Sequence, residues 1–413
     1  MRGIAAGPAG DQLDQFATNQ FEFIRSLEQY GPAVSIDLGG TETVWLYDIP
    51  AIHKLLADKF DHVDMPLLSR RLEVVTGTGL LTNFDWNVWS PRRRIIFRPI
   101  GARAVGNFVE RMTTLIEERL DTWPLGVPFE LEHAVSDMTL RVVADLLFSE
   151  DITDEAIAVI GRIVDELHRW SEADPTNANV TDPPESFREA LEEADSYIRS
   201  VIDARSPDAP VDDLLGVLLA AVDDEGVPID LQGVRDELIT MVLAGHETVT
   251  ALICFAIDLV GRHPETADAD RRHIVDETLR LYPPVHFLPR FVREDFDVGV
   301  CELPAGTEVF IPMIQLFRDE RYFERADEFL PERWDPDSPL HMERRAYFPF
   351  ITGPKLCVGS HYALMEGTIA LDRFLAKFDF ELLEPATPWG REFALTFLPD
   401  KPQSIVLERR AAE

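Results

Sequence analysis

The apolar segment from Leu231 to Arg262 restricts the possible folds of this 413-residue chain more than any other feature. Its residues are apolar on nearly all sides of a helix, which at about 1.5 Å per residue would be roughly 48 Å long. His246 and Glu247 lie near the middle of the segment, where a charge at bilayer depth would be costly. We therefore predict a buried helix that crosses the core of a soluble protein rather than a membrane span.

Sequence periodicity predicts the remaining elements. Apolar residues at three- and four-residue spacing predict amphipathic helices at about Arg103 to Trp123, Leu131 to Phe148, Ile152 to Trp170, Glu185 to Arg205 and Gly359 to Phe378. β-Forming residues predict strands at Ala33 to Leu38, Thr43 to Tyr47, Thr307 to Ile311 and Ser404 to Leu407, the first two joined as a hairpin. The expected fold is mainly α with small β-sheets, in a single domain from residue 1 to residue 413.

Charge and cysteine usage narrow the possible partners and the compartment. The chain has 39 Lys and Arg residues against 74 Asp and Glu residues, and its formal net charge of −35 repels phosphate backbones and anionic lipid. We expect no nucleic-acid partner and no membrane anchor. Three cysteines form no disulfide framework, and the N-terminus lacks the apolar stretch of a secretory signal, so we expect a cytoplasmic location.

The loop around Cys357 is the sharpest local signal. Residues Phe350 to Gly359 have the pattern F-x-x-G-x-x-x-C-x-G, which chance would produce on the order of 0.0006 times in a chain of this composition. Gly353 and Gly359 would allow tight turns around the sulfur. The N-terminus of the following helix would stabilise a thiolate, the form that binds metal. On this pattern alone, an inert buried thiol and a catalytic nucleophile remain alternatives.

The central helix carries a second signal, Ala244-Gly245-His246-Glu247-Thr248. Gly245 and Thr248 weaken a helix locally, so we predict a distortion that opens a polar notch. An acid beside a hydroxyl can relay protons to a reacting oxygen. Two other interpretations compete. A zinc motif H-E-x-x-H would need a second histidine where Thr250 stands, and Glu247 could be a satisfied core carboxylate.

Together these motifs resemble the cytochrome P450 family, and the resemblance extends over essentially the whole chain. It implies the cytochrome P450 fold and haem b (iron protoporphyrin IX), with the Cys357 thiolate as the axial ligand of the iron and Phe350 shielding the sulfur. Lys355 stands where the family usually has Arg or His and would reach a haem propionate. Glu247 and Thr248 would be the acid and the alcohol of a proton relay.

The resemblance also implies further haem contacts. Arg93, in Trp89-Ser90-Pro91-Arg92-Arg93, and Arg290, in Leu288-Pro289-Arg290, would bind the propionates. Trp89 stands where the family usually has His, and we assign it to the cofactor site beside Arg93.

Three further residues are expected to form a structural charge network. Glu277-Thr278-Leu279-Arg280 places opposite charges one helical turn apart, and Arg333, in Pro331-Glu332-Arg333-Trp334, resembles the family's meander motif. The resemblance implies that Glu277, Arg280 and Arg333 form a buried network that serves folding and haem retention rather than chemistry. The spacing alone is weak, because it recurs at Glu22/Arg25, Glu166/Arg169 and Glu185/Arg188.

Substrate contacts follow from the same resemblance. They would come from the segments 63–84, 172–184 and 395–397, and from Met241, Ala244, Val285, His286, Phe287 and Phe397. Most of these side chains are apolar, so we expect an apolar or amphipathic small-molecule substrate, with His286 able to meet a polar or acidic group.

Electrons would come from outside the chain, because three cysteines exclude a four-cysteine cluster and no flavin module is recognised. The resemblance implies a ferredoxin and an NAD(P)H-dependent reductase. We expect an acidic ferredoxin-like donor to dock on basic residues that stand out in this acidic chain, namely Arg92, Arg93, Arg94, Arg98, Arg344, Arg345 and Lys355.

The function implied is that of a haem-thiolate monooxygenase of bacterial soluble type, an oxidoreductase that inserts one atom of O2 into its substrate by hydroxylation or epoxidation. Two alternatives stay open. One is a peroxygenase or a non-hydroxylating haem-thiolate oxidase, and the other is a haem-bearing binding or sensing protein without turnover.

Overall fold

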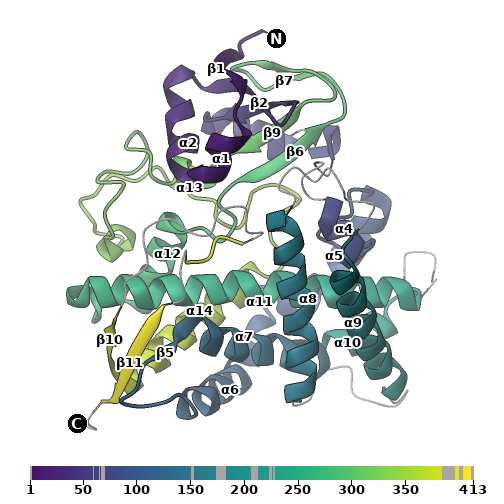
Figure 1. The fold of residues 1–413 in the computed structure, drawn as a ribbon, viewed down its shortest axis with the longest axis vertical. Helices are drawn as coiled ribbons and strands as arrows, with labels where there is room; N and C mark the ends of the chain where they lie inside the picture. Colours follow the sequence, from purple (N-terminus) through teal and green to yellow (C-terminus); the bar gives the residue numbers. More distant parts are fainter. Residues whose placement is uncertain are drawn as a thin grey trace. The chain divides into compact units, whose positions relative to one another are not determined.

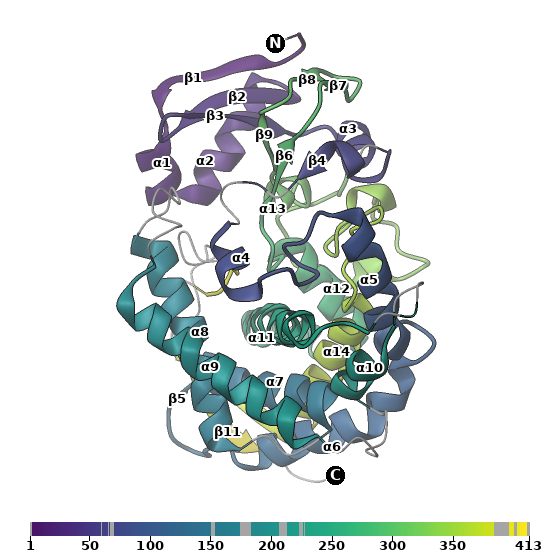
Figure 2. The ribbon, with the colours of Figure 1, turned by 90° about the vertical axis from the view of Figure 1, so that its right-hand side faces the viewer.

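The long apolar segment forms helix α11 (Leu231–Arg262) in the computed structural model of the protein, with the bounds that periodicity predicts. Among the residues that the structure describes, α11 is the one helix long and apolar enough to cross a membrane. However, 78% of its most apolar stretch is buried inside the protein, as in a core helix. Figure 2 looks along α11 and shows helices of the same unit on several sides of it.

The structure describes residues 2–58, 60–64, 66, 70–149, 153–173, 183–205, 213–222, 226, 228–383, 396–399 and 403–410. The chain divides into two units, each assembled from separate stretches of sequence. The first unit contains residues 1–68, 263–357 and 387–401, and the second contains residues 69–262, 358–386 and 402–413. Figure 1 labels the helices and strands of both.

The second unit is mainly helical. Besides α11 it contains α4 (Arg70–Thr76), α5 (Trp86–Ile100), α6 (Val109–Asp121), α7 (Leu131–Phe148), α8 (Asp154–Ala173), α9 (Glu185–Ala204), α10 (Leu214–Ala220) and α14 (Ser360–Lys377). Its antiparallel sheet has the order β10-β11-β5, from Phe378–Leu382, Ser404–Arg409 and Phe129–Glu130. Helix α11 packs closely on α7, since a Cβ atom added at Gly245 would lie 3.0 Å from Val143 Cγ2.

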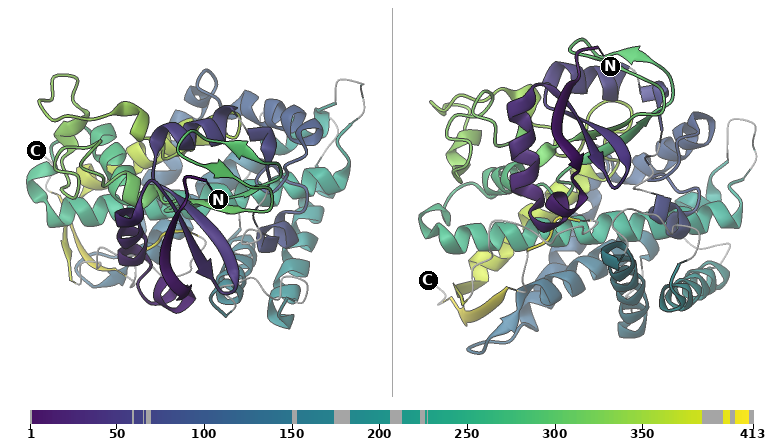
Figure 3. Two further views of the ribbon diagram at one scale, coloured as in Figure 1. Left: turned by 90° about the horizontal axis from the view of Figure 1, so that it is seen from above. Right: turned by 45° about the horizontal axis from the view of Figure 1, so that its top comes forward.

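The first unit is built on a six-stranded sheet with the order β1-β2-β3-β9-β6-β4. Its strands are Ala5–Asp11, Ala33–Leu38, Thr41–Leu46, Glu308–Ile311, Leu288–Val292 and Val63–Asp64, and a separate ribbon pairs β7 (Phe296–Asp297) with β8 (Glu302–Leu303). The predicted hairpin is confirmed, because β2 and β3 pair antiparallel with Leu38 opposite Thr41. Figure 3 shows strands β1 to β3 beside the N-terminal helices.

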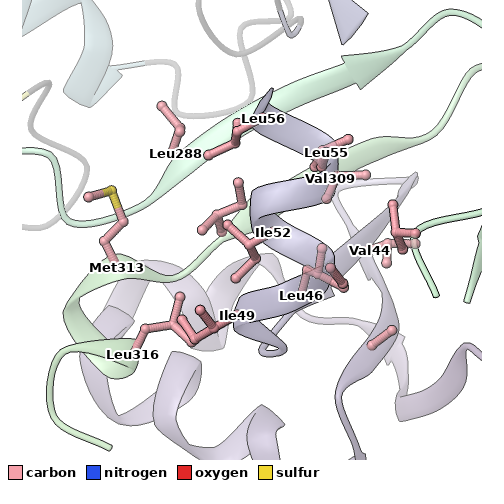
Figure 4. Packing of buried hydrophobic residues seen from close by; sticks show 14 of the residues in the cluster. Val44, Leu46, Ile49, Ile52, Leu55, Leu56, Leu288, Val309, Met313 and Leu316 are labelled. Atoms are coloured by element: carbon pink, nitrogen blue, oxygen red, sulfur yellow. The ribbon is translucent and has the colours of Figure 1, made fainter. Parts of the chain in front are cut away.

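Five helices complete the first unit: α1 (Leu13–Thr18), α2 (Gln20–Leu27), α3 (Ile49–His53), α12 (Arg271–Leu281) and α13 (Met313–Leu316). An apolar core forms where α3 and α13 pack on the sheet, and its side chains interlock in Figure 4. This core includes Val44, Leu46, Ile52, Val309 and Leu316, each at most 1% exposed.

Local rules explain where periodicity missed an element. Helix α5 contains Pro91 and Pro99 and three consecutive arginines, so it has no clean apolar repeat, although Asp85 caps its first turn by accepting from the Asn87 N–H at 2.9 Å. Helix α12 starts at Arg271 because the Asp270 carboxylate accepts from the N–H groups of the first turn.

Candidate functional site

The Cys357 loop closes on itself in the first unit. The Cys357 N–H donates to the Phe350 carbonyl at 2.9 Å, so both ends of the motif are joined by a backbone hydrogen bond, and the thiol is half-buried. Phe350 and Lys355 are also half-buried. The loop therefore presents the sulfur from a closed turn, and the chain enters α14 three residues later.

Two residues of this loop have a positive φ. Gly353 has a φ of +79°, and a Cβ atom there would lie 2.4 Å from the Leu56 carbonyl oxygen, so glycine is required. Ile351 has a φ of +65°, which is unusual for a β-branched residue and costs of order 1–3 kcal/mol. Gly359 differs from the expectation: its φ of −88° suits any residue, and a Cβ atom there would meet nothing within 4 Å.

The predicted charge network lies together in the first unit. Arg280 donates to both oxygens of Glu277, at 2.7 and 2.9 Å, and Arg333 Nε donates to Glu277 Oε1 at 3.3 Å. The three side chains are fully buried. The two guanidinium groups also donate to backbone carbonyls between Phe317 and Glu328, which ties the region that precedes the cysteine loop to α12.

The segment after α12 brings several predicted substrate residues together. The Phe397 N–H donates to the Pro284 carbonyl at 2.8 Å, and the Phe397 ring lies 5.1 Å from that of His286. Val285 and Phe287 are half-buried, whereas His286 and Phe397 are each 4% exposed. Their substrate contacts stay predictions. Leu395 and residues 174–182 lie outside the described residues.

His286 is held by another buried side chain, and its predicted contact with a polar or acidic substrate group stays a prediction. Its Nε2 lies 2.7 Å from the Gln20 side-chain oxygen, and burial lowers the pKa of the imidazole to about 3. The ring is neutral at physiological pH and is held by Gln20, so it offers no positive charge to an acidic substrate. A sequence cannot reveal this, because the ring is buried among groups from other parts of the chain, such as Gln20 of α2 and Phe397.

Helix α11 in the second unit leaves one stripe open. From Gly233 to Val260 its side chains are buried, except at four half-buried positions, Met241, Ala244, Gly245 and Thr248. Their spacing of three, four and seven residues places them on one helical face. Three of the four were predicted to face substrate or to activate oxygen, and this stripe shows that they share a face.

The acid and the alcohol on α11 have different surroundings. The Thr248 hydroxyl donates to the Ala244 carbonyl at 2.8 Å, as the sequence suggested, but the helix continues unbroken through both residues. Glu247 is buried, and its Oε1 lies 2.9 Å from His168 Nε2 on α8. Among the described residues, no three His, Cys, Asp or Glu side chains gather as metal ligands.

Trp89 orients Arg93 on α5. The Arg93 guanidinium carbon lies 5.4 Å from the centre of the Trp89 ring and 5.8 Å from that of Phe97. Trp89 is buried and stacks on Trp86 at 5.2 Å. The tryptophan therefore restrains the arginine by a cation–π contact.

Arg92 does not fit the docking role that we expected for it. Its Nη1 donates to the Thr78 carbonyl at 2.9 Å and lies 3.3 Å from Glu237 Oε1, and only 16% of its side chain is exposed. Burial, opposed by Arg92 and by the Leu80 N–H, raises the pKa of Glu237 to about 7. Four other arginines of the predicted docking surface are exposed: Arg94, Arg98, Arg344 and Arg345. Their role in docking an electron donor stays a prediction.

The residues present fit a haem. Arg290 is 7% exposed, and burial lowers the pKa of its guanidinium to about 10, so a carboxylate such as a propionate would offset a desolvated cation. The half-buried thiol of Cys357 in a strained loop is a suitable soft ligand for iron. In the second unit, Arg93 offers another cation that a propionate could pair with, and α11 offers its stripe of half-buried residues.

Sequence reasoning missed three residues of this region. His168 and Glu237 are recognised only through their partners on another element, so no local signal identifies them. Ile351 lies inside the cysteine motif, but nothing in its side chain indicates a positive φ.

Comparisons with known proteins agree with this geometry. The cytochrome P450 family model matches residues 11–274 and 271–406. The chain is 28% identical to cyclooctatin synthase from Streptomyces melanosporofaciens, over 86% of this chain and 84% of that protein. It is 25% identical to pentalenene oxygenase from Streptomyces avermitilis, over 91% and 90%.

Solved structures share the fold. A retinoic acid-bound cyanobacterial CYP120A1 matches with a TM-score of 0.85 and 22% identity, covering 99% of this chain and all of that one. The cytochrome P450DA heme domain matches with a TM-score of 0.84 and 20% identity, covering all of this chain and 99% of that one. The chain belongs to the cytochrome P450 family and is a haem-thiolate monooxygenase.

Proposed function

We propose that this monooxygenase oxidises an apolar or amphipathic substrate by hydroxylation or epoxidation. The open stripe of α11 carries the proposal, because Met241 and Ala244 offer an apolar surface next to a single hydroxyl, that of Thr248, while Gly245 at the edge of the stripe packs on Val143 of α7. An apolar surface with few polar groups is typical of a site that binds an apolar molecule.

We assign the haem contacts residue by residue. Cys357 would ligate the iron, with Phe350 beside it, and Arg290, Arg93 and Lys355 would bind the propionates. A bound haem supplies the iron at which O2 is reduced and one oxygen atom is inserted into the substrate. The buried Glu277 network serves this assignment indirectly, since it fixes the segment that leads into the cysteine loop.

Protons are the contribution of α11 itself. We assign Glu247 as the acid and Thr248 as the alcohol that move a proton toward the reacting oxygen. Because the Thr248 hydroxyl hydrogen is engaged by the Ala244 carbonyl, its oxygen lone pairs are free to accept. The surrounding buried side chains of α11 keep bulk water away from this step.

Electrons would come from an acidic ferredoxin-like donor and an NAD(P)H-dependent reductase, in the cytoplasm. The exposed arginines Arg344 and Arg345 in the first unit and Arg94 and Arg98 in the second support this proposal. Arg344→Glu should slow reduction by such a donor and weaken its salt dependence in stopped-flow measurements. Arg199→Glu, at an exposed position on α9, is the matched control. Equal reduction rates in both variants and the wild type would reject the docking role of Arg344.

The reduced protein should give the carbon-monoxide difference spectrum of thiolate-ligated haem, and Cys357→Ala should abolish it. A ligand panel should contain the hydrocarbon pentalenene, the amphipathic retinoic acid and several polar compounds. Titration with the apolar members should shift the haem spin state. A shift only with polar compounds would contradict the proposed substrate class. Product formation with hydrogen peroxide as efficient as with reductant would favour the peroxygenase alternative.

A further inference from the structure

A buried acid–histidine pair joins α8 to α11. His168 Nε2 lies 2.9 Å from Glu247 Oε1, and the two side chains are 13% and 7% exposed. The next residue back in the chain, His246, faces another way, since its Nε2 lies 2.9 Å from the Ser136 hydroxyl of α7. Each of the two consecutive residues of α11 is therefore engaged by a different helix. Figure 1 shows the three helices α7, α8 and α11.

Helix geometry separates this pair from the open stripe. Successive residues of an α-helix project about 100° apart, because a turn contains 3.6 residues. Glu247 is buried, whereas Thr248 is one of the four half-buried positions. The carboxylate that we assign as the acid thus lies toward α8, not along the face that carries the Thr248 hydroxyl.

The other charges near His168 have their own partners. On α8, Arg162 pairs with Glu189 and Glu193 of α9, and Glu166 pairs with Arg169 and accepts from Ser186. Asp165 of α8 and His246 of α11 are further titratable groups near the pair. Burial lowers the pKa of His246, which disfavours a second imidazolium beside Glu247.

We propose that His168 is a positioning residue for Glu247, which it holds on the α8 side of α11 and supplies with protons. In this step the proton on His168 Nε2 moves to Glu247 Oε1, leaving a neutral imidazole and a neutral carboxyl group. Nδ1 keeps its proton throughout, so Nε2 is the atom that regains one, from water that reaches it once the carboxyl group has turned away, and no electron moves. Neutralised, the pair loses its ionic attraction, so the carboxyl group can turn toward Thr248.

The inference rests on the proposed role of Glu247, and it adds a pH dependence. Histidine changes its charge near physiological pH, whereas a lysine or an arginine at the same place would stay charged. Proton supply through His168 should therefore weaken as the pH rises above the range in which the imidazole is protonated.

The first test is spectroscopic and needs no turnover. Histidine-selective NMR of the haem-loaded protein, in its diamagnetic reduced carbon-monoxide form, follows the ring of His168, which His168→Gln identifies. In Glu247→Gln the midpoint of this ring titration should move to lower pH, because the carboxylate that favours the imidazolium is gone. An unchanged midpoint would overturn the inference.

The second test measures the fraction of consumed O2 that is released as hydrogen peroxide, with a surrogate ferredoxin and its reductase and no added substrate. Poor proton supply raises this fraction. Wild-type protein should show a rise between about pH 6 and pH 8, and His168→Gln should release a high fraction throughout, with O2 reduction to water slowed about tenfold. His168→Lys keeps the positive charge, so it should still hold Glu247. The fraction of O2 released as peroxide by this variant should not change between these pH values. His133→Gln, at an exposed position on α7, is the control.

These outcomes separate the two proposals. If Glu247→Gln releases as little peroxide as the wild type, the proposed role of Glu247 is wrong. If Glu247→Gln releases more peroxide but His168→Gln and His168→Lys both follow the wild-type pH profile, the inference about His168 is wrong while the role of Glu247 stands.

Discussion

Glu277 in the first unit and Glu237 in the second are both fully buried carboxylates, yet they are supplied with very different numbers of donors. Glu277 accepts from Arg280, from Arg333, from the Trp334 indole at 3.0 Å and from the Leu330 N–H at 3.0 Å. Glu237 accepts from the Leu80 N–H and a longer contact from Arg92, at 3.3 Å.

The number of hydrogen-bond donors decides what each carboxylate can do. With two guanidinium groups and two further N–H donors, Glu277 is held in place as a permanent part of the scaffold. With fewer donors, burial prevails at Glu237 and raises its pKa to about 7, so this group can take up a proton near neutrality. Burial alone therefore does not decide whether an acid is structural or titratable.

The largest expected effect comes from breaking the Glu277 network. Arg333→Ala should lower the free energy of unfolding by about 3–5 kcal/mol and release haem, because it leaves a buried charge without one of its partners. Urea denaturation, read by circular dichroism and haem absorbance, measures both changes. Arg325→Ala, which removes an exposed ion pair with Glu328, should cost less than about 1 kcal/mol. Equal losses in both variants would contradict the scaffold role.

A smaller effect should appear as a pH dependence at Glu237. The folded-state pKa of about 7 lies above the ordinary value of 4.5 for a glutamate, so the protonated group contributes stability below pH 4.5, and this stability is lost as the pH rises through 7. Glu237→Gln removes the titration, so its stability relative to the wild type should rise by about 3 kcal/mol between these pH values.

Urea denaturation across that pH range measures the difference, with Glu110→Gln, at an exposed position on α6, as the control. A pH-independent difference between Glu237→Gln and the wild type would mean that Glu237 does not titrate in this range.

The smallest of the three effects is expected at Arg92. Arg92→Gln removes the cation that lowers the pKa of Glu237, so this pKa should rise further, and stability above pH 7 should fall by about 2 kcal/mol. Arg94→Gln, at an exposed neighbouring position, should leave the unfolding free energy nearly unchanged. If both variants behave alike, the Arg92–Glu237 contact does not stabilise the second unit.

Glutamate–arginine spacing illustrates how far a sequence motif can be interpreted. The E-x-x-R spacing of Glu277 and Arg280 recurs at Glu185 and Arg188, and the structure forms both ion pairs. Only the first is fully buried, whereas the second has 74% and 45% of its side chains exposed. The spacing predicts a local contact, because it follows from helix geometry, but burial depends on what packs over the helix.

Helices with a clean apolar repeat were predicted, but not all of their bounds were: the helix expected from about Arg103 is α6, which begins at Val109, and the helix expected from Ile152 to Trp170 is α8, which spans Asp154–Ala173. The bounds of α7 and α11 agree with the periodicity, since each buries a continuous face or its whole circumference. Helix α5 did not show such a repeat, because its prolines and arginines interrupt it. The cysteine motif was equally clear, but the positive φ of Ile351 inside it was not.

The sequence by itself determined the family, the long core helix and the position of the thiolate loop, because all of these depend on residue order and short-range spacing. Only the tertiary structure decided which side chain faces which: His168 beside Glu247, Arg92 beside Glu237, and His286 neutral beside Gln20. The physical reason is that charge and protonation respond to desolvation and to neighbours from other elements, which chain order does not encode locally.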